Sequence, residues 1–222
     1  MNAIHIVPNW FYDFGVAFNL IFLVISCSVA LYSYKVYKLS SKNEIKYFSI
    51  GFSLISLAYL SKVLLFLTTF VSINEKYVGI IVEKLNTTGL FLTYSHLTLF
   101  IIGITTILYA TLKTESFRIY ILLILLSLIS IFLTSNKIKS FLSISALYLL
   151  FISYHYGKEY IKFKNFKTAL IFIGFVLLFI SKLEVSISSF YLSFLIEQAI
   201  ELVAYLFIAC SLVLVFRKGN KK

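Results

Sequence analysis

Five ionisable side chains lie inside long apolar stretches of this 222-residue chain. We call them the charged layer, and they are Lys62, His96, Lys182, Glu197 and Glu201. A charge at the centre of a membrane helix costs on the order of 3 kcal/mol, so such a residue normally faces the interior of a helix bundle and pairs there. Ammonium, carboxylate and imidazole groups together are also able to hold a small polar or charged solute and to change protonation when it binds.

Four members of the charged layer share one predicted depth. A basic residue marks the end of each apolar stretch, and we counted the residues from it to the member of the charged layer. The separations are 16 residues for Lys46–Lys62, 17 for His96–Lys113, 15 for Lys167–Lys182 and 16 for Glu201–Arg217. At 1.5 Å per helical residue these distances are all about 22 to 26 Å. Glu197 lies one helical turn from Glu201 on the same face. The layer is therefore predicted in the outer half of a helix bundle.

Two functions fit such a layer. In the first, the groups surround a cavity open to the outside and bind or transport a small polar or charged solute, as in a transporter or receptor. In the alternative, Lys62 and Lys182 neutralise the two glutamates in salt bridges that fix helix packing, as in a structural or assembly subunit of a membrane complex. A water-accessible pocket favours the first function, and a closed, dry network favours the second. Asn19, Ser26 and Ser33 fit either, because their seven-residue spacing suits a cavity lining or a helix-packing stripe.

The composition indicates a membrane protein. The chain is 60% hydrophobic and 18% aromatic, its mean hydropathy is +0.96, and soluble domains are typically about 45 to 50% apolar. The net charge of +11 comes from basic residues that punctuate the apolar stretches, so it indicates orientation in a bilayer and not nucleic-acid binding. We expect an integral protein of the cell (plasma) membrane with the lipid bilayer as its partner. A small polar or ionic ligand, other membrane proteins and a second copy of the chain stay open as further partners.

Seven apolar runs are long enough to cross a hydrocarbon layer about 30 Å thick. They predict an all-α, polytopic, seven-transmembrane-helix bundle that forms a single domain over residues 1–222. The runs are 14–36, 48–71, 88–112, 117–135, 140–156, 168–188 and 191–216. Fourteen lysines and arginines flank the runs on one side and four on the other. The positive-inside rule therefore predicts an external N-terminus and a cytoplasmic C-terminus.

An internal repeat organises the runs. Segments 32–52 and 154–175 both pass from Tyr-x-Tyr through a lysine-rich loop to Ile-Gly-Phe, with one residue of difference in length. Residues 96–113 can be laid on 201–218 with mostly like-for-like substitutions. These matches predict a 3+1+3 parallel repeat with the fourth helix as linker. In this alignment Lys62 corresponds roughly to Lys182, and His96 to Glu201.

In layout this repeat resembles the SWEET and PQ-loop transporters, which use parallel repeats about an axis along the membrane normal. The resemblance implies transport, but it stops at topology. Those families carry a Pro-Gln signature in a helix of each repeat, whereas the one proline of this chain, Pro8, lies outside every predicted span. No functional residue is therefore carried over.

Enzyme and cofactor chemistry is less well supported. A retinal protein needs a lysine in its last helix, and the run 191–216 has none. His96 and His155 are predicted at different depths, so they cannot share a haem. His96, Glu197 and Glu201 offer three zinc ligands, but no HxxxH or HExxH motif accompanies them. We expect no cofactor, no metal and no enzymatic activity, and we expect Cys27 and Cys210 to be free, buried thiols.

Overall fold

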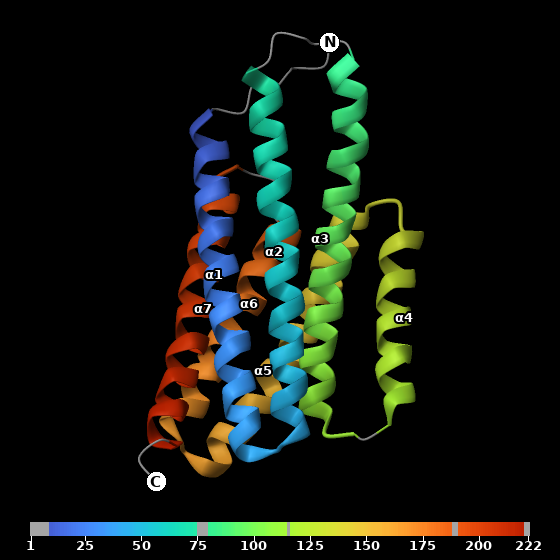
Figure 1. The fold of residues 1–222 in the computed structure, drawn as a ribbon. Coiled ribbons are helices and arrows are strands. Elements are labelled where there is room, and N and C mark those ends of the chain that lie inside the picture. The colour runs from blue at the N-terminus through green and yellow to red at the C-terminus, as the bar shows by residue number, and fades with distance from the viewer. Residues whose placement is uncertain (1–8, 75–79, 115, 188–190, 220–222) are drawn as a thin grey trace.

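The computed structural model describes residues 9–74, 80–114, 116–187 and 191–219, and these residues form seven helices (Figure 1). The helices are α1 (Asn9–Ser40), α2 (Asn43–Asn74), α3 (Ile80–Leu112), α4 (Phe117–Leu133), α5 (Lys137–Phe163), α6 (Phe166–Ile187) and α7 (Tyr191–Gly219). Each predicted apolar run falls on one helix, which confirms the all-α prediction. Several helices continue past the apolar run into its polar flanks, because lysine and tyrosine are compatible with helix wherever their polar ends reach water.

Six of the described helices are long and apolar enough to cross a membrane, and α4 is the exception. With 17 residues, α4 is about 25 Å long, slightly less than the hydrocarbon thickness of about 30 Å. Large apolar side chains also cover the outside of the bundle, as Phe91 (70% exposed) and Ile161 (74%) illustrate. Lipid solvates such a surface and water does not, so the chain is a multi-pass integral membrane protein. A membrane-spanning α4 stays a prediction.

The helices form two groups of three with α4 at the side (Figure 1). Within each group, helices that follow one another in sequence pack side by side: α1 packs on α2 and α2 on α3, and α5 packs on α6 and α6 on α7. The groups meet where α1 packs on α7 and α3 packs on α5, and α4 contacts α3 and α5. We call the end of the bundle where α1 begins the upper end and the opposite end the lower end, as in Figure 1.

Two glycines, one in each group of helices, allow close helix contact. A Cβ atom on Gly51 of α2 would lie 2.5 Å from Ile107 Cγ1 and 2.8 Å from the Gly103 carbonyl oxygen of α3. A Cβ on Gly174 of α6 would lie 2.6 Å from Ile208 Cγ1 and 3.0 Å from the carbonyl oxygen of Ala204 on α7. Small residues let membrane helices approach this closely, and close approach is what holds them together in lipid.

The α1–α2 and α5–α6 connections use the same turn. Ser41 and Lys164, which follow α1 and α5, have φ angles of 54° and 45°, in the left-handed region. The Ser41 amide donates to the Tyr37 carbonyl at 2.8 Å, and the Lys164 amide donates to the Tyr160 carbonyl at 2.7 Å. Each turn thereby satisfies a carbonyl at the end of its helix and reverses the chain within a few residues.

The expectation of buried thiols is wrong. Cys27 of α1 and Cys210 of α7 are free, as expected, but both are exposed on the bundle surface. Sequence could not show this, because the lipid-facing and inward-facing sides of these helices are equally apolar.

Candidate functional site

Three members of the charged layer form a buried ion-pair network. Lys182 of α6 donates from Nζ to Glu197 Oε1 at 2.9 Å and to Glu201 Oε2 at 3.2 Å, both on α7. The side chains of Lys182, Glu197 and Glu201 are only 7%, 8% and 1% exposed. The two carboxylates reach one ammonium because they are four residues apart on one helix face and α6 packs antiparallel to α7.

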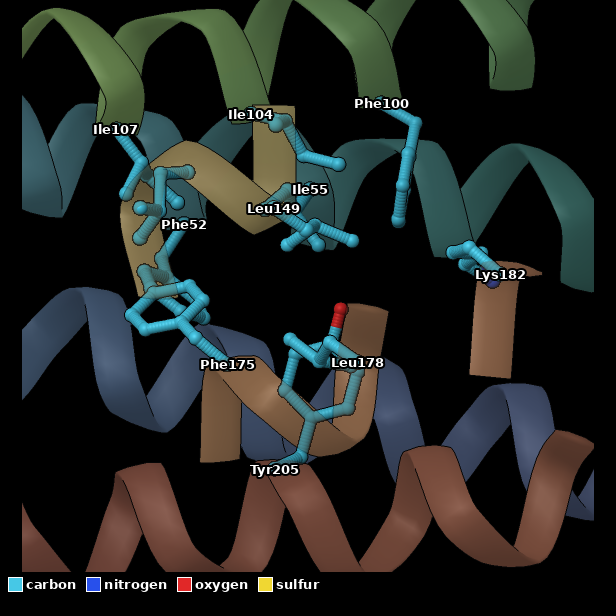
Figure 2. A pocket seen from close by; sticks show the side chains of 11 residues that line it. Phe52, Ile55, Phe100, Ile104, Ile107, Leu149, Phe175, Leu178, Lys182 and Tyr205 are labelled. Atoms are coloured by element: carbon cyan, nitrogen blue, oxygen red, sulfur yellow. The ribbon is translucent and has the colours of Figure 1, made fainter. Parts of the chain in front are cut away.

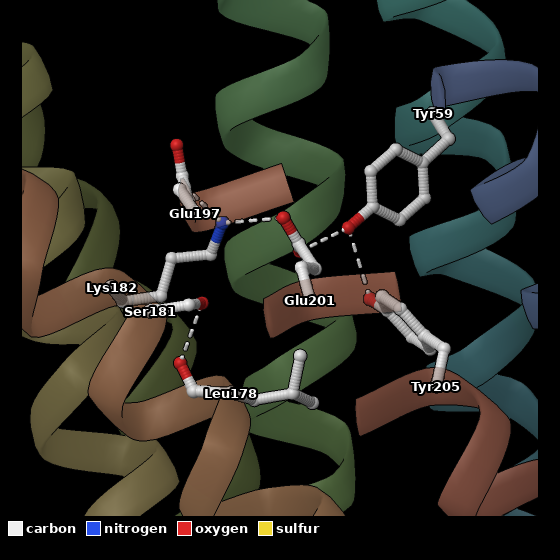
Figure 3. A network of polar contacts seen from close by, with 7 residues as sticks. All are labelled: Tyr59, Leu178, Ser181, Lys182, Glu197, Glu201 and Tyr205. Atoms are coloured by element: carbon white, nitrogen blue, oxygen red, sulfur yellow. Dashed lines mark hydrogen bonds and ion pairs between the residues drawn. The ribbon is translucent and has the colours of Figure 1, made fainter. Parts of the chain in front are cut away.

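The other oxygen of Glu201 is held from the opposite group of helices. The Tyr59 hydroxyl of α2 donates a hydrogen bond to Glu201 Oε1, and it lies 3.1 Å from the Tyr205 hydroxyl of α7. Figure 3 shows Glu201 between Lys182 on one side and the two tyrosines on the other. Both tyrosines are 1% exposed. Glu201 therefore joins α2, α6 and α7 through hydrogen bonds that are strong because one partner is charged.

His96 and Lys62 border this network. His96 of α3 lies with Nδ1 3.0 Å from the Ala58 carbonyl oxygen of α2, so Nδ1 carries the donated proton. Its ring centre is 6.2 Å from that of Tyr59. Lys62 is partly buried on α2, three residues after Tyr59, and lies within electrostatic range of Glu197 and Glu201. With two lysines and two glutamates ionised, the formal charges of the layer cancel.

The structure thus brings Lys182, Glu197 and Glu201 into direct contact and places His96 against the network through a backbone bond. Among the residues that the structure describes, no group of three His, Cys, Asp or Glu side chains is arranged to hold a metal ion. His96, Glu197 and Glu201 are thus not arranged as the three zinc ligands that the sequence offered.

A cavity borders the network on its lower side (Figure 2). It has a volume of about 10 Å³, enough for one water molecule at most. Apart from Lys182 and Tyr205 its lining is apolar, and Phe52, Ile104 and Leu178 are typical members. Lys182 also lies over the Phe100 ring, 5.4 Å from its centre. On this side the network has no room for a solute.

Sequence reasoning missed Tyr59, Tyr205 and Gln198. A signal was present, because both tyrosines lie in the middle of a span, whereas tyrosines of membrane proteins are enriched at the interfaces. Tyr59 precedes Lys62 by three residues and Tyr205 follows Glu201 by four, spacings that place each on the same helix face as its charged neighbour. Gln198 is fully buried beside the glutamates.

The polar stripe of α1 points inward. Asn19, Ser26 and Ser33 are all fully buried. The Asn19 amide donates to the Gly15 carbonyl, and the Ser26 hydroxyl donates to the Phe22 carbonyl at 2.6 Å. Ser26 thus fits the packing interpretation, since its hydroxyl is satisfied within its own helix.

The fold and this network define a multi-pass helical membrane protein with a buried ion-pair network that links its two groups of helices. Comparison with known protein families, with curated proteins and with solved structures gave no match. The resemblance in layout to the SWEET and PQ-loop transporters therefore stays a prediction.

Proposed function

We propose that the protein binds or transports a small polar or charged solute, and that the contacts of Glu201 open and close as the solute passes. One observation carries this proposal. Glu201 accepts hydrogen bonds from Lys182 of α6 and from Tyr59 of α2, so a single carboxylate links both groups of helices. Ionisable residues inside a membrane are costly, and they commonly mark substrate or proton pathways.

We further infer that α1–α3 and α5–α7 are two parallel copies of one unit, with α4 as linker. The shared turn supports this, because Tyr37 and Tyr160 are 123 residues apart, and so are Gly51 and Gly174. From the turn to the glycine this register needs no gap, whereas the Tyr-x-Tyr alignment required one; α3 and α7 correspond at a spacing of 101 residues, as Ile107 and Ile208 do. Such a duplication requires a counterpart for the α1–α7 contact, and the α5–α3 contact fits this requirement.

The register pairs different residues from those matched by sequence. A spacing of 123 residues relates Tyr59 to Lys182, and the contacts of the two glycines relate Phe100 to Glu201. Within the first copy, Tyr59 packs edge-on against Phe100 with ring centres 6.0 Å apart; the corresponding pair of the second copy, Lys182 and Glu201, is also in contact. Between the copies, the hydrogen bond from Tyr59 to Glu201 corresponds to the contact of Lys182 with the Phe100 ring. Each contact has its counterpart, and Glu201 lies where the two copies meet.

This arrangement suits a small change between two states. A solute that carries its own charge competes for Lys182 or for the two carboxylates. If it draws the Glu201 carboxylate away from the Tyr59 hydroxyl, the contact between the copies weakens. Among the described residues, twelve lysines and arginines lie toward the lower end. We infer from this excess that the lower end is cytoplasmic and that the network lies in the outer half of the cell membrane.

The alternative, a structural or assembly subunit of a membrane complex, is favoured by a different observation. The cavity beside the network has room for one water at most, and the formal charges of the layer cancel when both lysines and both glutamates are ionised. Such a network is able to fix helix register with no ligand at all.

One experiment separates the two functions. Wild type and Glu201→Gln are purified in lipid nanodiscs, and their melting temperatures are compared from pH 5 to 8 in the presence and absence of a mixture of charged metabolites. Solute handling predicts that wild type responds to pH or to the mixture and that Glu201→Gln does not. Equal, flat profiles for both proteins would support the structural alternative.

A further inference from the structure

Two buried amide side chains, one on α1 and one on α7, have unused hydrogen-bonding groups. Gln198 of α7 and Asn19 of α1 are both fully buried. Within the described part of the chain, neither the Gln198 oxygen nor its nitrogen has a hydrogen-bond partner, and the Asn19 oxygen has none. Buried polar groups in native proteins are nearly always satisfied, by protein or by an ordered small molecule, so three unused atoms in one region need an explanation.

The two amides belong to one seam. α1 and α7 run in the same direction and pack together, and the Phe22 and Tyr205 ring centres are 5.7 Å apart across the seam. Asn19 precedes Phe22 by three residues and Gln198 precedes Tyr205 by seven, so they lie about 4.5 and 10.5 Å above this contact. The seven-residue spacing also keeps Gln198 on the helix face of Tyr205.

The seam leads to the network. Gln198 is three residues from Glu201 on α7, within one helical turn. The Asn19 amide donates to the Gly15 carbonyl, and Gly15, seven residues before Phe22, lies at the level of Gln198. The unused groups are therefore two acceptors and an NH₂ donor on the α1–α7 seam, and Gln198 lies in sequence between the two glutamates of the network.

We propose that Gln198 and Asn19 form a binding site for a small uncharged group that both donates and accepts hydrogen bonds, either water or the hydroxyl or amide of a solute. This inference rests on the function proposed above, since it names the group that reaches Glu201. Uncharged chemistry follows from the lining, because an amide pair offers donors and acceptors but no counter-charge. The apolar rings of Phe22 and Tyr205 close the site below.

The sign of a stability change tests the site. Gln198→Met and Asn19→Leu keep the approximate shape of each side chain but remove its polar atoms. If the amides hold an occupant, both variants lose its bonds, and the melting temperature should fall by about 2 to 4 °C. Gln198→Met is the deciding variant, because Asn19→Leu also removes the hydrogen bond to the Gly15 carbonyl. If Gln198 has no partner, removing its polar atoms relieves a buried unsatisfied group and raises the melting temperature, which overturns the proposal. Ser26→Ala is the control, since its hydroxyl bonds within its own helix.

The occupant is identified with acetamide as probe. If acetamide stabilises wild type more than Gln198→Met, the site takes a solute amide; if it stabilises both equally while Gln198→Met is still the less stable, the site holds water. Should both variants fail to fold, a second test uses Gln198→Cys in a Cys27→Ser, Cys210→Ser background. This variant is treated with a small water-soluble thiol reagent, and complete protection of the cysteine from labelling would overturn the proposal. The pH response of wild type against Glu201→Gln tests the proposed function separately, because those proteins keep both amides.

Discussion

The Tyr59 hydroxyl donates a hydrogen bond to the Glu201 carboxylate, although 142 residues separate the two in sequence. The bond joins α2 to α7, and Lys182 of α6 binds the other oxygen of the same carboxylate. A buried carboxylate is tolerated in this apolar bundle because both of its oxygens are satisfied.

Removing the Tyr59 hydroxyl should destabilise the protein. Tyr59→Phe leaves Glu201 Oε1 without its donor inside the bundle, which should cost about 1 to 3 kcal/mol. The measurement is the free energy of unfolding in detergent or lipid nanodiscs. Tyr154→Phe is the control, because Tyr154 is 60% exposed and should tolerate the change. An equal, small effect of both substitutions would contradict a structural role for the bond.

Lys182 and Glu201 should be strongly coupled. Lys182→Met or Glu201→Gln alone leaves an unbalanced buried charge and should cost about 3 to 5 kcal/mol, whereas the double variant should cost much less than the sum. A double-mutant cycle on thermal stability measures the coupling. The same cycle with Lys62→Met should give a smaller value, because the ammonium of Lys182 is the one that bonds both carboxylates. Additivity of Lys182 and Glu201 within a few tenths of a kcal/mol would show that they do not interact in the membrane.

Gly51 and Gly174 should not accept a methyl group. Gly51→Ala and Gly174→Ala place a Cβ within 3.0 Å of a neighbouring helix, which should cost about 1 to 3 kcal/mol through overpacking. Gly89→Ala is the matched control, since its nearest neighbour would be 3.7 Å away. That variant should be neutral or gain up to about 1 kcal/mol from helix propensity. Similar costs at Gly51 and Gly174 would also support the proposed duplication, and a cost at only one would count against it.

The ion pair between Lys113 and Glu159 at the lower end should contribute little to stability. That contribution should not change with pH near neutrality. Lys113 donates to Glu159 at 3.1 Å, with the lysine side chain 49% exposed. This hydrogen bond raises the pKa of Lys113 above its ordinary value of 10.5. A raised pKa means that the contribution is complete below pH 10.5 and is lost only as the pH rises through the raised value. The difference in stability between wild type and Lys113→Met should therefore be below about 1 kcal/mol and constant from pH 6 to 9.

Orientation in the cell is testable directly. A cytoplasmic reporter fused after Lys222 should be active, and Lys137→Cys in a Cys27→Ser, Cys210→Ser background should react with a membrane-impermeant thiol reagent from outside. The reason is the excess of basic residues at the lower end, where α1, α3, α5 and α7 finish. Reaction of Lys137→Cys from the cytoplasmic side alone would reverse the topology.

The amino-acid sequence by itself determined the class of this protein and the position of its helices. Runs of apolar residues long enough to cross a bilayer form helices in lipid, because each backbone group must be satisfied within its own segment. The unusual residues were also visible, since Lys182 and Glu201 interrupt apolar stretches. Their shared depth followed from counting residues along each helix at 1.5 Å per residue.

Only the tertiary structure decided which side chains meet. In a soluble helix an apolar stripe shows which face is buried, but lipid is as apolar as a protein core, so the sequence of a membrane helix hides its rotation. Cys27 and Cys210 were misplaced for this reason, and Tyr59 was missed as a partner of Glu201 although both lie in predicted spans. The choice of Lys182 as the ammonium that bonds both glutamates likewise depends on how α6 is turned against α7. Helix rotation is set by packing contacts between segments far apart in the chain, and no local pattern of residues records it.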